Sequence, residues 1–167
     1  MHSEFSSNLI FCTLWREEIN LEVRCVKAED VSEYYVRSLN ESIYVENPPT
    51  TVAEQIDIIR RLNSCPNTIP LGFFDGGTLT ATSFVRLTSG DAEIGIFIIP
   101  GKIKGKKLSY ILILKIIELF DFKIKFFKAG VNKKNLPSLR AFLKAGFSQV
   151  AAPNEERIFL SRKSSRA

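Results

Sequence analysis

The hydrophobic pattern of the chain changes at Pro100, and this change restricts the folds that are possible. Before it, three strand-like runs follow one another at 68–74, 78–87 and 92–99. After it comes an apolar run at 106–120 with the length of a helix, and then strand and helix patterns alternate. Such a chain forms antiparallel strands first and a strand–helix–strand crossover later. We therefore expect an α/β (α+β) fold: a single domain with a mixed, mostly antiparallel sheet of six to seven strands flanked by helices.

Turn and cap residues support this order of elements. Asp75-Gly76-Gly77 separates the first two strand runs, and glycine reaches positive φ without a Cβ clash, which predicts a hairpin. The other expected elements are a strand at 21–26, helices that open at the capping boxes Asp30–Glu33 and Thr51–Glu54, a strand at 124–131, a helix at 135–145 closed by Gly146, and a strand at 158–161. We expect residues 1–19 to be an N-terminal extension and residues 20–163 to be the domain.

Length and composition limit the class of protein. A chain of 167 residues with 45% hydrophobic residues can bury a core without disulfides or metal. Its most apolar stretch, 108–120, is shorter than the ~20 residues that a bilayer requires. The three cysteines are odd in number and form no CxxC pair, which predicts a reduced, cytoplasmic protein.

The shortage of histidine excludes several kinds of active site. His2 is the only histidine, and it lies at the start of the chain. Ser-His-Asp triads and zinc sites of the HExxH type therefore have no candidate residues, and we expect no metal. A general base has to be a carboxylate, a tyrosine, a lysine or a water molecule.

Four lysines, Lys102, Lys104, Lys106 and Lys107, lie within six residues where the apolar helix is expected to begin. A solvated basic face is one interpretation, in keeping with the net charge of +5 and the pI near 9.2. However, positive side chains at a helix N-terminus oppose the helix dipole, whereas the free N–H groups there bind anions. We therefore favour an anion site. A nucleic-acid or anionic-membrane surface is an alternative, but it lacks aromatic side chains interleaved with the lysines.

Two segments resemble the cofactor motifs of the GNAT acetyltransferase superfamily: AEIGIFIIPGKIKGKKLSYILILKIIELF (92–120) and AGVNKKNLPSLRAFLKAGF (129–147). The family's first motif reads Arg/Gln-x-x-Gly-x-Gly/Ala, and here Lys102, Gly105 and Lys107 take those places. Lys107 departs from the pattern, since the family has a small residue there. The second motif begins at Asn135, which is also a good helix N-cap.

The resemblance implies that acetyl-CoA is the co-substrate. Its phosphates would lie at Lys102, Lys104, Gly105, Lys106 and Lys107, its pantetheine arm near Asn135, and its thioester carbonyl at the backbone N–H groups of Ile98 and Ile99. For catalysis, the resemblance suggests Glu93 as the base, either directly or through a water, and Ser138 as a residue that assists the sulfur. The structural alternatives for these two residues are an exposed strand carboxylate and a first-turn helix hydroxyl. The family's usual acid, a tyrosine, is replaced by Phe142.

We expect an N-acetyltransferase that moves an acetyl group from acetyl-CoA to a primary amine. The partner is then a small-molecule amine rather than nucleic acid or a membrane, and a homodimer is compatible with such a domain. An amino sugar or a nucleotide-linked amino sugar is the first expectation for the acceptor, with Tyr44, Glu46 and Asn47 as candidate substrate-binding residues. Two alternatives stay open: a protein N-terminal acetyltransferase of the ribosomal-protein type, and a non-catalytic CoA-binding protein.

Overall fold

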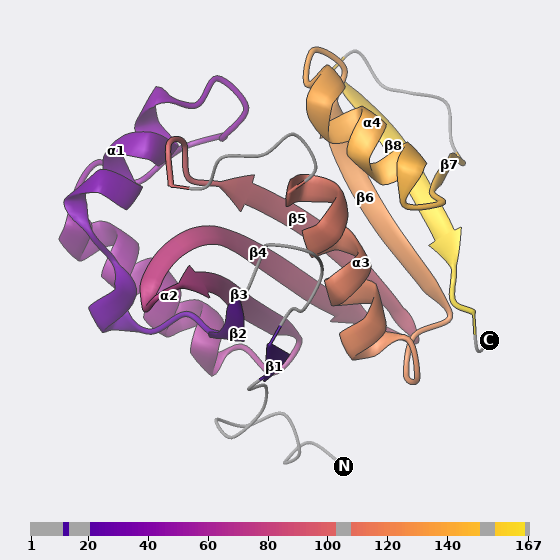
Figure 1. Ribbon diagram of the computed structural model, residues 1–167, viewed down its shortest axis with the longest axis horizontal. Coiled ribbons are helices and arrows are strands. Elements are labelled where there is room, and N and C mark those ends of the chain that lie inside the picture. Colours follow the sequence, from indigo (N-terminus) through magenta and orange to yellow (C-terminus); the bar gives the residue numbers. More distant parts are fainter. Residues whose placement is uncertain (1–11, 14–20, 103–107, 151–155, 166–167) are drawn as a thin grey trace. The chain divides into compact units, whose positions relative to one another are not determined.

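The computed structural model describes residues 12–13, 21–102, 108–150 and 156–165, and Figure 1 shows how its elements follow one another. The strands are β1 (Cys12–Thr13), β2 (Glu22–Cys25), β3 (Thr68–Asp75), β4 (Thr78–Thr88), β5 (Asp91–Ile98), β6 (Phe126–Asn132), β7 (Ser148–Gln149) and β8 (Arg157–Lys163). The helical elements are a 3-10 turn, η1 (Ala28–Asp30), and the helices α1 (Glu33–Glu41), α2 (Val52–Ser64), α3 (Leu108–Phe120) and α4 (Leu136–Lys144).

The strands hydrogen-bond in the order β1-β2-β3-β4-β5-β6-β8-β7. Within the described ranges this makes one sheet of eight strands, of which β1 and β7 contribute two residues each. The pairing of β5 with β6 is parallel, whereas β1–β2, β2–β3, β6–β8 and β7–β8 are antiparallel. The predicted mixed, mostly antiparallel sheet with flanking helices is confirmed. β1 lies within the predicted extension and adds a short edge to β2.

The chain divides into two compact units, which we describe one at a time. The N-terminal unit comprises Met1–Phe84 and Phe97–Ile103, and the C-terminal unit comprises Val85–Ile96 and Lys104–Ala167. β4 and β5 each contribute residues to both units.

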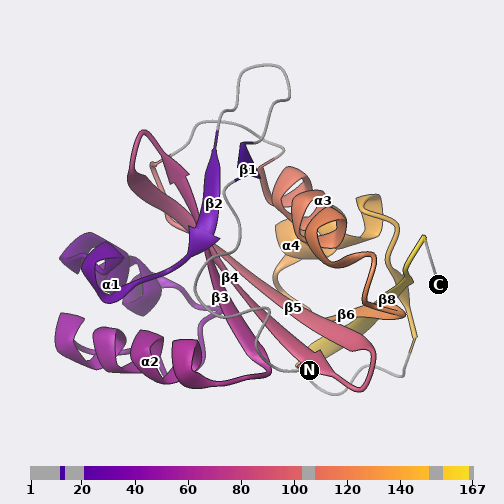
Figure 2. The same cartoon turned by 90° about the horizontal axis from the view of Figure 1, so that it is seen from below.

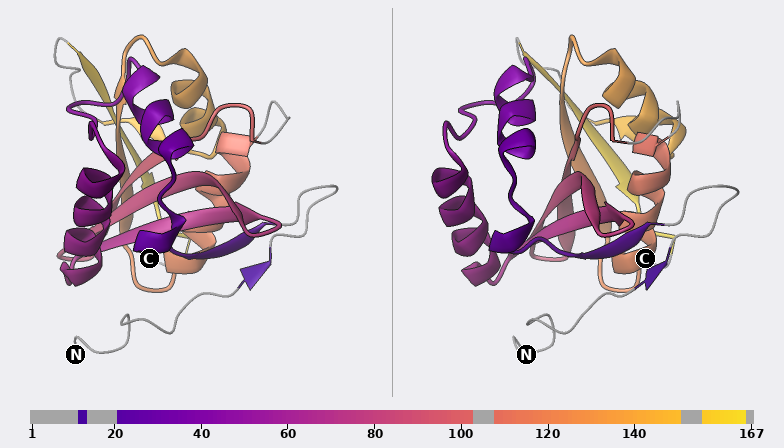
Figure 3. Two further views of the ribbon diagram at one scale, coloured as in Figure 1. Left: turned by 90° about the vertical axis from the view of Figure 1, so that its left-hand side faces the viewer. Right: turned by 60° about the vertical axis from the view of Figure 1, so that its left-hand side comes forward.

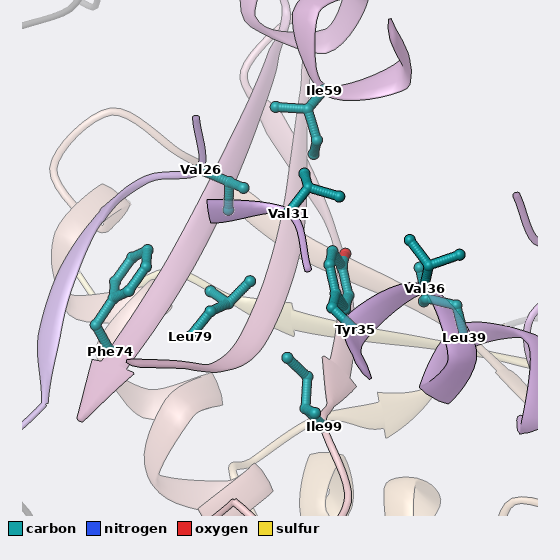
Figure 4. Close-up of a cluster of buried hydrophobic side chains, with 9 residues drawn as sticks. All are labelled: Val26, Val31, Tyr35, Val36, Leu39, Ile59, Phe74, Leu79 and Ile99. Atoms are coloured by element: carbon teal, nitrogen blue, oxygen red, sulfur yellow. The ribbon is translucent and has the colours of Figure 1, made fainter. Parts of the chain in front are cut away.

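The N-terminal unit has a core in which η1, α1 and α2 meet the strands (Figure 4). Its buried members are Val26, Val31, Tyr35, Val36, Leu39, Ile59, Phe74, Leu79 and Ile99. Tyr35 is 1% exposed, and its hydroxyl hydrogen-bonds with Thr82 Oγ1 at 3.3 Å and accepts from Gln55 Nε2 at 3.3 Å. Burial raises the pKa of this hydroxyl against the opposing effect of the two hydrogen bonds. Tyr35 is therefore a satisfied core residue that stays protonated.

The start of α1 differs from the prediction. Its N-cap is Ser32, whose hydroxyl accepts from the Tyr35 amide at 3.2 Å, so the predicted Asp30–Glu33 capping box is wrong. Asp30 instead accepts two hydrogen bonds of 2.7 Å from the Arg24 guanidinium, a residue on β2. The same carboxylate accepts from the Lys27 amide at 2.7 Å, so Asp30 caps the 3-10 turn η1 and not α1.

The predicted N-cap of α2 and the predicted β3–β4 hairpin are confirmed. Thr51 is the N-cap of α2 and accepts from the Glu54 amide at 3.1 Å, and the Glu54 carboxylate accepts from the Thr50 amide at 2.7 Å. The β3–β4 hairpin turns at Gly76 and Gly77, which have φ values of 53° and 81°. Both angles lie in the left-handed region that glycine reaches at low cost.

In the C-terminal unit, α3 and α4 lie on one side of β5, β6 and β8 (Figure 2). The buried residues of α3 are Leu108, Leu112, Ile113, Ile116, Ile117 and Phe120. On β6, Phe127, Ala129 and Val131 alternate with more exposed residues and are at most 4% exposed. Because successive side chains of a strand point to opposite faces, these three residues mark the face that packs against the helices.

Helix α4 follows its predicted boundaries. Asn135 is the N-cap, Pro137 lies in the first turn, and Gly146 follows the helix with a φ of 87°. Of two neighbouring apolar residues on α4, Phe142 is 3% exposed, whereas Leu143 is 46% exposed. Among the described helices, none is long and apolar enough to cross a lipid bilayer.

Candidate functional site

The candidate site in the C-terminal unit begins where the pairing of β5 with β6 ends. Parallel pairing joins only Asp91 with Phe126, Ala92 with Phe127 and Glu93 with Lys128, although both strands continue. Beyond this point the strand pairing of β6 within the described residues is with β8 on its other side, as far as Asn132. The facing edges of Ile94–Ile96 and Ala129–Asn132, which we call the β5–β6 edges, therefore carry backbone groups that no strand pairing uses. Such groups bind an extended ligand through main-chain hydrogen bonds.

The chain after β6 brings two predicted residues to the end of these edges. The Asn135 amide donates to the Asn132 carbonyl at 2.8 Å, so α4 starts directly beyond the strand. The Asn135 side chain accepts from the Ser138 amide at 3.2 Å, which fixes its oxygen as the helix cap. Ser138 itself is half-buried in the first turn. The structure thus places Asn135 and Ser138 together.

Glu93 is the last residue of β5 that pairs with β6. Its carboxylate lies 3.4 Å from Arg86 Nη1, and the two side chains are 50% and 67% exposed. A second carboxylate on the same face, that of Asp91, pairs with Lys128 Nζ at 2.5 Å. Arg86 is a neighbour of the candidate base that the sequence interpretation missed. Its position seven residues before Glu93, across a short turn, was the signal that could have revealed it.

In the N-terminal unit, one of the two expected backbone donors already has a partner. The Ile99 amide donates to the Thr80 carbonyl of β4 at 2.9 Å. Because N–H groups alternate between the two edges of an extended strand, the amide of Ile98 faces away from β4.

The turn that leads into the lysine cluster is held by α1. Tyr34 donates from its hydroxyl to the Pro100 carbonyl at 2.6 Å, and Lys102 Nζ lies 4.8 Å from the centre of the Tyr34 ring. Gly101 has a φ of 72° in this turn. Tyr34 was not among the predicted site residues, since nothing in its local sequence relates it to Pro100. The predicted residues Lys104, Gly105, Lys106 and Lys107 lie outside the described residues.

The predicted acceptor loop follows α1. Tyr44, Glu46 and Asn47 are exposed, and Asn47 has a φ of 48°. Beside this loop lies a cleft of about 600 Å³ between α1 and α2, which are seen next to each other in Figure 3. Its lining residues are Glu33, Val36, Arg37, Asn40, Thr50, Thr51, Val52 and Ala53. None of the three predicted residues lines it, whereas Glu33 and Arg37 are one helical turn apart and could have been identified from that spacing.

Cys25 is poorly suited to act as a nucleophile. Burial raises the pKa of the Cys25 thiol, which disfavours the thiolate that a nucleophile needs. No cluster of three His, Cys, Asp or Glu side chains able to hold a metal ion occurs in the part of the chain that the structure describes.

The chain has the fold of the GNAT N-acetyltransferases. It is similar to the spermidine N-acetyltransferase of Vibrio cholerae in complex with CoA and spermine, with a TM-score of 0.76, 15% identity, and coverage of 87% of this chain and 96% of that one. Ribosomal-protein-S5-alanine acetyltransferase of Vibrio fischeri aligns with a TM-score of 0.73 and 12% identity, over 92% and 97% of the two chains.

A third solved structure is AAC(6')-Ib in complex with paromomycin and acetyl-CoA, with a TM-score of 0.71, 17% identity, and coverage of 87% and 94%. No protein-family model matches the sequence, and no curated protein matches it significantly. At these identities the likeness establishes the fold, and the resemblance to the GNAT superfamily is confirmed at that level.

Proposed function

We propose that the chain is a GNAT-superfamily N-acetyltransferase that moves the acetyl group of acetyl-CoA to a primary amine of a small molecule. The observation that carries this proposal is the end of β5–β6 pairing at Glu93 and Lys128, which leaves two strand edges for an extended ligand in a GNAT fold. The similar solved structures include complexes with CoA and with acetyl-CoA.

The residues at these edges fit the coenzyme. A pantetheine arm is an extended chain with two amides, and the β5–β6 edges offer main-chain donors and acceptors of the spacing that such a chain needs. Asn135 and Ser138 stand at the end of β6, where the arm would pass. The lysines from Lys102 to Lys107 would then neutralise the phosphates, together with the amides at the start of α3.

The proposed reaction is direct attack of the amine nitrogen on the thioester carbonyl. A C–N bond forms, the C–S bond breaks, and CoA leaves as the thiolate. The amide N–H of Ile98 would stabilise the charge that develops on the carbonyl oxygen. Glu93 would take the proton that the amine loses, either directly or through a water, and Ser138 would donate a hydrogen bond to the sulfur. A thiol pKa of about 8.5 lets the thiolate leave without a strong acid, which accommodates Phe142 in the usual tyrosine position.

For the acceptor, we propose an amino sugar or a nucleotide-linked amino sugar. Tyr44, Glu46 and Asn47 provide polar groups on the loop beside α1, and the cleft there has a volume in the range of small-molecule sites. A protein N-terminal acetyltransferase is a second candidate, favoured by the likeness to the ribosomal-protein-S5-alanine enzyme.

The test combines binding and turnover. Calorimetric titration with acetyl-CoA should give micromolar affinity, and Gly105→Val should abolish it, because a branched side chain blocks the approach of phosphate to the backbone. Mass spectrometry over a panel of amines should then detect one acetylated product. Binding of CoA without transfer to any amine would instead favour a non-catalytic CoA-binding protein, and unchanged affinity in Gly105→Val would contradict the assigned phosphate loop.

A further inference from the structure

The C-terminal unit has an exposed sheet face on the side opposite α3 and α4 (Figure 2), and we call it the open face. Its side chains on β6 alternate with those of Phe127, Ala129 and Val131, which are buried. Cross-strand partners of a sheet share a face, so the register of β6 with β8 defines the members. They are Phe126, Lys128, Gly130 and Asn132 on β6, and Arg157, Phe159, Ser161 and Lys163 on β8.

Two phenylalanine rings of this face are open to solvent. Phe126 is 42% exposed and Phe159 is 37% exposed, whereas Phe127 on the other face of β6 is fully buried. A Cβ atom at Gly130 would lie 3.8 Å from Phe159 Cε1, so the Phe159 ring leans from β8 onto the glycine of the neighbouring strand. Because Gly130 has no side chain, the ring can lie against β6 and still keep an exposed side.

The two rings are separated by a polar strip. Phe126 is paired with Lys163, and Phe159 lies four residues from Lys163 on β8. With about 3.3 Å per residue and about 4.8 Å between strands, the rings are anchored roughly 14 Å apart. Lys128 and Ser161 pair with each other and lie between them. The rings therefore form two separate flat contacts rather than one apolar patch.

The charges around the rings favour a polyanion. The residues that β6 and β8 contribute to the open face include three cations and no carboxylate. The neighbouring carboxylates are on β5, where Asp91 pairs with Lys128 Nζ at 2.5 Å. Glu93 lies 3.4 Å from Arg86 Nη1. Among the described residues, Lys163 is exposed and has no carboxylate at ion-pair distance.

We infer that the open face binds a single-stranded nucleic acid, with one base stacked on Phe126, another on Phe159, and a phosphate held by Lys163. Every base has a π-face that stacks on an aromatic side chain, and exposed rings on a sheet bind single strands in this way. From the sequence we expected no nucleic-acid partner, because the lysine cluster has no aromatic side chains among its lysines. The open face supplies such side chains from β6 and β8, and the inference does not depend on the proposed acetyl transfer.

The polar strip disfavours two other occupants, an anionic bilayer and a second copy of this chain. Either of them would bury the strip between the rings, and with it the ammonium of Lys128 and the carboxylate of Asp91. Burial removes the hydration of both charges, which is unfavourable even for an ion pair. Stacked bases cover the rings and leave the charged strip in water.

Fluorescence anisotropy of the full chain with a labelled single strand of about 12 nucleotides, without acetyl-CoA, tests the inference. RNA and DNA of the same sequence are titrated in parallel. Phe126→Ala and Phe159→Ala should each weaken binding by at least about fivefold, because each removes the stacking of one base. Phe126→Leu and Phe159→Leu keep most of the packing and should lose nearly as much, which separates stacking from unfolding. Leu143→Ala is the matched control: it removes a side chain that is 46% exposed on α4, across the sheet, and should change affinity by less than about twofold.

The salt dependence of binding gives a second readout. Lys163→Gln should reduce the steepness of log affinity against log salt concentration by about 0.7, the value for one phosphate contact of a single strand. Arg140→Gln removes one positive charge from an exposed position on α4 and should leave the slope unchanged.

Binding of RNA alone or of DNA alone supports the inference and identifies the strand. Failure to bind either, equally tight binding of a duplex of the same sequence, or equal losses in the ring variants and Leu143→Ala would overturn it. Vesicles of phosphatidylcholine and phosphatidylglycerol, and sedimentation of the chain by itself, examine the other occupants. Vesicle binding or dimerisation that needs the two rings, while strand binding does not, would also overturn it. Titration of acetyl-CoA tests the proposed function separately, so the two results are judged independently.

Discussion

Replacing Tyr34 tests whether α1 positions the turn that opens the lysine cluster. Tyr34→Phe removes only the hydroxyl, and with it the 2.6 Å hydrogen bond to the Pro100 carbonyl. Tyr34→Leu also removes the ring, and with it the cation–π contacts with Lys102 Nζ at 4.8 Å and with the Arg37 guanidinium at 5.3 Å. The two variants therefore separate the hydrogen bond from the cation–π interaction.

The expected losses of acetyl-CoA affinity follow from the free energies of the two interactions. A hydrogen bond of this kind contributes about 1 kcal/mol, so Tyr34→Phe should weaken acetyl-CoA binding by about fivefold. An exposed cation–π contact adds about 0.5–1 kcal/mol, which brings Tyr34→Leu to roughly 10- to 30-fold. These values are upper limits, because a bound ligand can itself hold the turn in place.

Isothermal titration calorimetry with acetyl-CoA measures both affinities, and urea unfolding measures the accompanying loss of stability. If Tyr34 positions the turn, the affinity for acetyl-CoA and the free energy of unfolding should both fall from wild type to Tyr34→Phe and again to Tyr34→Leu. A Tyr34→Leu protein that binds acetyl-CoA within twofold of wild type, while its unfolding free energy has fallen by more than 1 kcal/mol, would refute the reasoning. Tyr34 would then serve the fold of the N-terminal unit alone.

Three further predictions concern the described residues. Hydrogen bonds from Arg24 and from the Lys27 amide outweigh the effect of burial and hold the pKa of Asp30 below its usual range, so Asp30→Asn should lower the unfolding free energy by about 1–2 kcal/mol at neutral pH. In urea titrations this difference should shrink as the pH falls below about 4 and through the lowered pKa; an unchanged difference at pH 2 would contradict it. Glu93→Gln should lower kcat at least about tenfold with an unchanged KM for acetyl-CoA, whereas Asp91→Asn on the same face should change kcat by less than about threefold in steady-state assays. Phe142→Ala should cost about 3–5 kcal/mol in chemical denaturation and Leu143→Ala under about 1 kcal/mol, and equal costs would show that α4 packs differently.

Much of the fold follows from short-range patterns. The β3–β4 hairpin, the caps at Thr51 and Asn135 and the stop at Gly146 all occur as predicted, because turns and caps depend on residues within a few positions of one another. The start of α1 was predicted wrongly for the opposite reason. Asp30 accepts from the Lys27 amide at the start of η1 and from Arg24 on β2, and no local pattern reveals the pair with Arg24.

Some parts of the candidate site also follow from the sequence. The order of its motifs and the lysine cluster are visible in the sequence, whereas the roles of Glu93, Asn135 and Ser138 stay predictions.

What the sequence by itself determined, then, is the list of elements and the chemistry that their residues carry, since propensity, capping and alternation act over a few residues. Only the tertiary structure decided where the pairing of β5 with β6 stops, that Tyr34 holds the Pro100 carbonyl, and that Arg157 folds over Gly130 beside Phe159. Each of these depends on contacts between residues more than 25 positions apart. Such contacts are selected by the packing of the whole core rather than by the preferences of either segment, so they become visible only when the chain is folded.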